Sequence, residues 1–67
     1  MNIGPRLLTL LEKKGMTQRE LANVIGVTET SISRYISGQR VPKSNIVVYM
    51  ADALNTTTDY LLGRTDK

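Results

Sequence analysis

The 67-residue sequence contains no cysteine and no histidine. Without cysteine the chain can form no disulfide, and without either residue it lacks the ligands of ordinary structural zinc sites. The absence of histidine also removes the commonest general base of enzymes. Catalytic triads built on histidine and cysteine–histidine pairs are therefore excluded, and we expect neither a metal ion nor a cofactor.

Long apolar runs are missing as well. Although 40% of the residues are hydrophobic, no stretch approaches the roughly 20 apolar residues that a membrane-spanning helix requires. Residues 1–6 show neither the charged start nor the apolar stretch of a signal peptide. We therefore expect a cytoplasmic protein without membrane association, and 67 residues correspond to one small domain.

Basic residues gather in the middle of the sequence. The net charge is +3, but residues 13–43 carry six basic against two acidic side chains, a balance of +4, whereas residues 44–67 carry two basic against three acidic ones, a balance of −1. A solvated surface of mixed charge would account for this bias, and so would an anionic partner.

Helix signals dominate the pattern, and no segment shows the sustained period-two alternation of a half-buried strand. We predict helices at about 5–14, 18–25, 29–36 and 45–54, followed by a short fifth helix that ends at Gly63. The sequence therefore predicts an all-α fold: a compact five-helix bundle over residues 1–63, with a short frayed tail at 64–67.

Local start and stop signals set the limits of these helices. Thr17 and Glu20 have the spacing of a capping box at the start of the second helix. Thr28 and Ser44 are N-cap candidates for the third and fourth helices, and Thr57 or Thr58 for the fifth.

The segment from Gln18 to Tyr35 has the joint spacing of a helix-turn-helix, in which two helices cross steeply after a turn of about three residues. A small residue at position 22 lets the helices approach, and glycine at position 26 suits the turn. The expected helix-turn-helix core consists of Leu21, Ala22, Ile25, Gly26, Val27, Ile32 and Tyr35. The simpler alternative is a generic helical bundle that merely packs the second helix on the third.

These residues also resemble a known family. The segments Thr17–Ala22, Ile25–Thr28 and Ile32–Tyr35 are similar to the Cro/CI-type (XRE-type) helix-turn-helix family, which includes phage repressors. The resemblance continues over about residues 3–63. It implies a fold like the DNA-binding domain of lambdoid phage repressors, with the helix-turn-helix at its centre.

Two positions depart together from the family pattern. Many members carry a glutamate where this chain has Ile36, paired with an arginine where it has Leu11. An apolar contact in place of a buried ion pair is often neutral or stabilising. We therefore predict that Leu11 and Ile36 touch.

The resemblance implies that the third helix enters the major groove of DNA as the recognition helix. It places Glu29, Thr30 and Arg34 at base-contacting positions. By its chemistry, Glu29 suits a cytosine amino group, Thr30 a thymine methyl group and Arg34 a guanine. For Glu29, the alternative is compensation of the helix dipole in a first turn. Phosphate contacts are expected from Gln18, Thr28, Ser33, Arg40 and Lys43, and the weaker candidates on the DNA side are Arg19 and Asn23.

Three classes of function compete. The leading hypothesis is a sequence-specific transcriptional regulator, a repressor that binds a two-fold operator in double-stranded DNA. It is expected to be associated with the nucleoid in the cytoplasm, and no small-molecule ligand is expected. The resemblance suggests a homodimer that forms through residues around Thr56–Leu62, and Tyr49 is expected outside the core, at an interface. The alternative is a protein-binding module on the same scaffold, such as an antitoxin or anti-repressor. No enzyme is expected, because the six acidic residues are spread over four helices and the tail.

Overall fold

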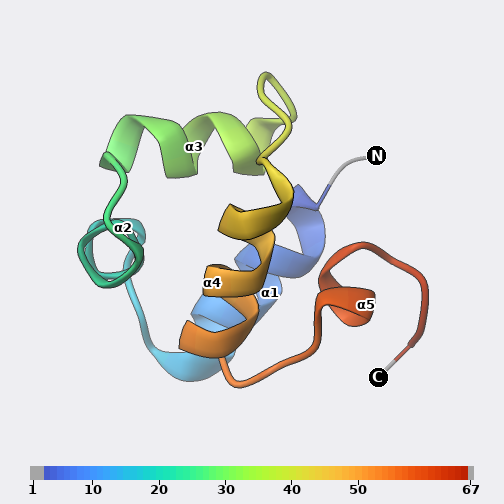
Figure 1. The fold of residues 1–67 in the computed structure, drawn as a ribbon. Coiled ribbons are helices and arrows are strands. Elements are labelled where there is room, and N and C mark those ends of the chain that lie inside the picture. Colours follow the sequence, from blue (N-terminus) through green and yellow to red (C-terminus); the bar gives the residue numbers. More distant parts are fainter. Residues whose placement is uncertain (1–2, 67) are drawn as a thin grey trace.

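A computed structural model describes residues 3–66, and within this range the chain forms five helices and no strand. They are α1 (Gly4–Lys14), α2 (Gln18–Ile25), α3 (Glu29–Ser37), α4 (Ser44–Ala53) and α5 (Thr58–Leu61). In Figure 1, α3 lies across the top, α4 runs down the middle in front of α1, and α2 and α5 flank them. The all-α, five-helix prediction is confirmed. No helix in this range is long and apolar enough to cross a membrane.

Threonine side chains begin three of the helices. In the predicted capping box, the Glu20 amide donates to Thr17 Oγ1 at 3.1 Å, and the Thr17 amide donates to Glu20 Oε1 at 3.0 Å. At the start of α3 the Thr28 side chain accepts the Ser31 amide, and at the start of α5 the side chain of Thr57, one of the two predicted candidates, accepts the Tyr60 amide. Each cap satisfies an amide that the first helical turn leaves without a backbone partner.

The predicted N-cap of α4 is wrong by one residue. Ser44 is already the first helical residue, and Lys43 is the N-cap, with an extended backbone and no capping side-chain hydrogen bond. The carbonyl of Lys43 accepts the amides of Ile46 and Val47 at 2.9 and 3.1 Å. The helix ends at Ala53, and Asn55 follows with a positive φ of 52°, a conformation that asparagine tolerates better than most residues.

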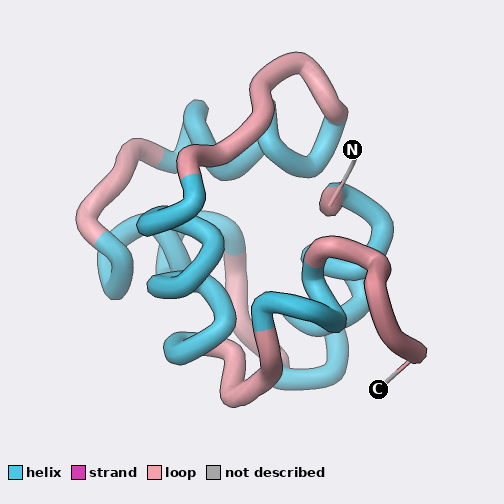
Figure 2. Tube along the Cα trace, turned by 45° about the vertical axis from the view of Figure 1, so that its right-hand side comes forward, coloured by secondary structure: helices cyan, strands magenta, loops and turns pink. Residues whose placement is uncertain are grey.

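One apolar core joins all five helices. The largest fully buried side chains are Leu7, Leu21, Ile32, Met50, Leu54 and Leu61, which come from every helix or its immediate end. No polar or charged side chain is buried in the described part of the chain. The turned view of Figure 2 shows how the loops run around the outside of this helical assembly. Removing one of these side chains would therefore weaken the contacts between several helices at once.

Helix α1 meets both α3 and the end of the chain. It packs against α3 and α5. Leu11 is buried in the core and Ile36 packs against the same core, so the two lie in shared surroundings, and their direct contact stays a prediction. Arg6 donates from Nη1 to the Thr65 carbonyl at 2.8 Å, and its guanidinium lies 4.6 Å from the centre of the Tyr60 ring. Residues 64–66 of the expected tail thus include a contact with α1, and Lys67 lies outside the described residues.

Candidate nucleic-acid interface

Helices α2 and α3 form a helix-turn-helix. The turn begins at Gly26, whose φ of 77° is left-handed and whose amide donates to the Ala22 carbonyl at 2.9 Å. A side chain at this φ would be strained. Six of the seven expected core positions lie on the inside of the unit: Leu21, Ala22, Ile32 and Tyr35 are buried, and Ile25 and Val27 are half-buried against them. The seventh, Gly26, is exposed and forms the turn.

Helix α3 divides sharply between an inner and an outer side. Ile32 and Tyr35 point into the core, at 0% and 4% exposure. The candidate base-contacting and flanking side chains of the helix, Glu29, Thr30, Ser33 and Arg34, are all exposed. Residues three and four apart share a helix face, so the structure brings these four side chains to one outward, polar surface, hereafter the recognition face.

The Thr28 hydroxyl is occupied within the protein. Its oxygen accepts the Ser31 amide at 3.1 Å, and its hydrogen is donated to Ser31 Oγ at 2.9 Å. A hydroxyl carries one donor hydrogen. Thr28 therefore has a structural role that is independent of the phosphate contact expected from the sequence.

An ion pair crosses from α2 to α3 at the edge of the recognition face. Arg19 Nε donates to Glu29 Oε1 at 3.4 Å, with both side chains largely exposed. Sequence reasoning placed both residues near DNA but missed the pair itself. The opposite charges ten positions apart were the only available signal, and it becomes meaningful only once the two helices cross. Asn23, the other weak candidate, is exposed one turn further along α2.

Two basic candidates lie beside α3 on the connector to α4. Arg40 and Lys43 are exposed, and they line a hollow of about 440 Å³ together with Thr28, Ser31 and Asn45. The Arg40 guanidinium is 6.0 Å from the centre of the buried Tyr35 ring, within range of a cation–π contact. Asn45 was not singled out from the sequence, although its exposed amide in the first turn of α4 is a donor suited to a phosphate.

Gln18 occupies the first position of α2 and is half-buried. It borders an open pocket formed by the end of α1 and the start of α2, with Leu8, Leu11 and Met16 among the lining residues. The first amides of a helix attract anions because they lack backbone acceptors and because the helix dipole is positive there. This placement suits the phosphate contact expected of Gln18.

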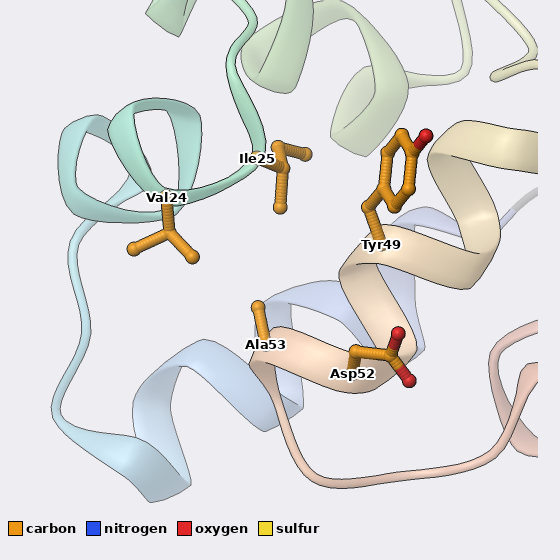
Figure 3. A pocket seen from close by; sticks show the side chains of 5 residues that line it. All are labelled: Val24, Ile25, Tyr49, Asp52 and Ala53. Carbon is orange, nitrogen blue, oxygen red and sulfur yellow. The ribbon is translucent and has the colours of Figure 1, made fainter.

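Two further hollows are more apolar than the recognition face. The first lies between α2 and α4 and is lined by Val24, Ile25, Tyr49, Asp52 and Ala53 (Figure 3). Figure 3 shows Val24 pointing toward Ala53, and Tyr49 is 48% exposed, outside the core as expected. The second, hereafter the apolar groove, joins the connector, α4 and α5, and is lined by Val41, Pro42, Ser44, Val47, Val48, Thr58 and Leu62.

No metal centre accompanies these surfaces in the part of the chain that the structure describes. Among residues 3–66, no group of three or more aspartate or glutamate side chains lies close enough together to hold an ion.

Comparison with known proteins finds the same architecture. Residues 7–61 match the helix-turn-helix family. The DNA-binding domain of the P22 c2 repressor, solved by nuclear magnetic resonance, superimposes with a TM-score of 0.86 over 92% of this chain and 82% of that domain, at 26% identity. A crystal structure of the P22 c2 repressor with a synthetic operator gives 0.84 over 91% of this chain and 92% of that chain; at 24% identity it supports the fold alone.

Two named transcriptional regulators are each at least 33% identical to this chain. The transcriptional repressor RstR of the cryptic phage CTXphi from Vibrio cholerae serotype O1 (strain ATCC 39315 / El Tor Inaba N16961) is 38% identical over 64 residues, which are 96% of this chain and 57% of that protein. The HTH-type transcriptional regulator ImmR of Bacillus subtilis (strain 168) is 33% identical over 64 residues, 96% of this chain and 50% of that protein. The chain thus spans only about half the length of these relatives.

Proposed function

Because this chain belongs to the helix-turn-helix family, in its Cro/CI-type (XRE-type) branch, we propose that it is a DNA-binding transcriptional regulator. In this proposal it acts as a repressor that binds a two-fold operator, with α3 in the major groove. The relatives named as transcriptional regulators and repressors support this function. So does the DNA-binding domain of P22 c2, which has the same fold.

The observation that carries the proposal is the two-sided character of α3. Its inner side is anchored by the fully buried Ile32 and by Tyr35, and its outer side presents only polar side chains to solvent. An α-helix fits the major groove, where each base pair displays its own pattern of donors and acceptors. A helix held rigidly from behind and polar in front suits that groove.

The proposed contacts divide into two kinds. Glu29, Thr30 and Arg34 read base edges from the recognition face. Gln18, Thr28, Ser33, Arg40 and Lys43 hold the phosphate backbone on either side of it, with Arg19 and Asn23 nearby. Phosphate contacts position a protein on the duplex, whereas base contacts supply specificity.

We propose a second copy of this chain as the occupant of the apolar groove. Two of its side chains, Val41 and Val48, are 69% and 45% exposed, and the groove includes Thr58 and Leu62 from the segment expected to form the dimer. A two-fold operator requires two recognition helices about one helical turn, roughly 34 Å, apart. Burying the same apolar groove of both copies against each other would join two domains for such a site.

Selection from a pool of random duplexes tests the proposal. Electrophoretic shift with wild-type protein is expected to enrich a two-fold site, and affinity should fall steeply as salt rises because bound phosphates release counterions. Arg34→Ala should weaken binding to that site by about tenfold to hundredfold, corresponding to about 1–3 kcal/mol for a paired base contact. Arg64→Ala is the matched control, since it removes the same charge from an exposed side chain that follows α5 and lies outside the helix-turn-helix.

Either of two results would contradict the proposal. One is binding that never exceeds the non-specific level. The other is equal behaviour of Arg34→Ala and Arg64→Ala. Weak binding with little salt dependence would favour the protein-binding alternative, in which the apolar groove receives a different protein.

A further inference from the structure

We propose that Arg19 determines specificity by holding the Glu29 carboxylate against one cytosine of each half-site. The inference rests on the proposed DNA-binding function and concerns the same surface. It assigns Arg19 a role beyond that of one more positive charge near the phosphates. The base preference at a single position should then depend on a residue that does not touch the base.

The Arg19–Glu29 ion pair links α2 and α3 at the outer surface of the helix-turn-helix. Arg19 is the second residue of α2, Glu29 is the first residue of α3, and Nε of the former lies 3.4 Å from Oε1 of the latter. The side chains remain 77% and 52% exposed. The pair therefore stands on the protein surface beside the recognition face, where a partner can reach both members.

Folding stability does not account for this arrangement. Exposed ion pairs contribute little to stability, because water screens the charges and two long side chains must be ordered. The N-terminus of α3 already stabilises a carboxylate at Glu29 without a partner. The two charges interact more strongly where water is displaced, as at an interface with DNA.

At a DNA surface, a lone carboxylate would face the negative phosphates on both sides of the major groove. Arg19 offsets that charge while leaving acceptor capacity free. Its Nε uses one oxygen of Glu29, and among the described residues no other side chain donates to the carboxylate. Oε2 is then free to accept from the exocyclic amino group of a cytosine, the usual base partner of glutamate in the major groove.

The remaining N–H groups of Arg19 are available to bind a DNA phosphate. A guanidinium has five N–H groups in a planar fork, and only the Nε group is used by Glu29. The terminal nitrogens can bind a phosphate while Nε holds the carboxylate. Lysine lacks this fork, so Arg19→Lys should keep the phosphate attraction but lose much of the orientation of Glu29.

A double-mutant cycle on the selected operator tests the inference. Wild type, Arg19→Ala, Glu29→Gln and the double variant are titrated against duplexes that carry every base at each position of one half-site. Wild type should prefer cytosine at one position by tenfold or more. Glu29→Gln and Arg19→Ala should each reduce that preference at least fivefold and leave preferences elsewhere unchanged. In the Glu29→Gln background, Arg19→Ala should weaken all duplexes evenly.

Matched variants separate orientation from simple charge. Arg40→Ala removes an equal charge from a proposed phosphate contact and should weaken every duplex by a similar factor. Arg19→Lys should resemble Arg19→Ala in base preference but bind more tightly overall. Circular dichroism melts establish that each variant is folded, as expected for exposed positions.

The outcomes distinguish this inference from the function on which it rests. If wild type selects a site and Arg19→Ala weakens all bases evenly, Arg19 is only a phosphate contact and the inference is wrong, while the proposed function stands. The same holds if Arg19→Lys keeps the full cytosine preference. If wild type selects no site, both are overturned.

Discussion

The recognition face and the apolar groove are built in opposite ways on the same small core. On the recognition face, every outward side chain from Glu29 to Arg34 is polar and exposed. In the apolar groove, valine, proline and leucine side chains line the surface, and only Ser44 and Thr58 are polar. The first surface suits a charged partner that offers hydrogen bonds, and the second suits a partner that buries apolar area.

This difference implies that the two surfaces respond to different conditions. Contacts with phosphates weaken as salt rises, whereas burial of apolar area does not depend on screening. Salt should therefore affect DNA binding more than dimer formation, and protein concentration should affect dimer formation first. Substitutions on one surface should likewise change DNA binding or dimer formation without changing the other.

The largest effect is expected from a substitution in the apolar core, which supports both surfaces. Leu21→Ala deletes a fully buried side chain of α2 and should lower the free energy of unfolding by about 2–5 kcal/mol, because a cavity remains. A domain of this size has a total stability of only about 3–10 kcal/mol. We expect a much lower urea midpoint and loss of both DNA binding and dimer formation near the melting temperature.

Val24→Ala is the control for Leu21→Ala. It lies on the same helix at 64% exposure and should change stability by less than about 0.5 kcal/mol. Equal urea midpoints for the two variants would mean that α2 is not held by the core described here.

A smaller effect is expected from a substitution in the apolar groove, which should weaken dimerisation and leave DNA contacts at the recognition face intact. Val48→Asn places a polar amide in the groove, and an unsatisfied amide buried at an interface costs about 1–3 kcal/mol. Sedimentation should show dimerisation weakened tenfold or more, while binding of a single half-site changes little. Val24→Asn makes the same change in the hollow between α2 and α4 and should leave dimerisation intact. Equal effects of the two variants would place the dimer contact elsewhere.

The helices were largely predictable because their limits depend on neighbouring residues. Thr17 with Glu20, and the left-handed Gly26, act within one turn of the positions they define. The start of α4 was not predictable in this way, because its N-cap is set by the extended backbone at Lys43 and not by a capping side chain. The sequence shows that Ser44 could cap a helix, but the preceding backbone decides whether it does.

The candidate site was predictable residue by residue but not as an arrangement. Helical periodicity alone places Thr30 and Arg34 opposite Ile32, and the structure has them exposed. The contact of Arg19 with Glu29 depends on the crossing of two helices, and that of Arg6 with Thr65 joins residues 59 positions apart. Such contacts follow from the assembled fold, so no local pattern could reveal them.

The smallest effect concerns a residue that serves the recognition face from within. Thr28→Ala removes the hydroxyl that accepts the Ser31 amide at 3.1 Å and should lower the free energy of unfolding by about 1 kcal/mol, the usual contribution of an N-cap. Thr28→Ser retains the hydroxyl and should stay close to wild type. Because the hydroxyl also donates to Ser31 Oγ, a phosphate contact would require that hydrogen bond to break. Urea titration with and without the selected operator separates the two roles: a pure cap loses the same stability in both, whereas a phosphate contact loses more with DNA bound. Unchanged stability of Thr28→Ala without DNA would show that α3 does not depend on this cap, and that burial of Ile32 and Tyr35 is enough to hold the recognition face.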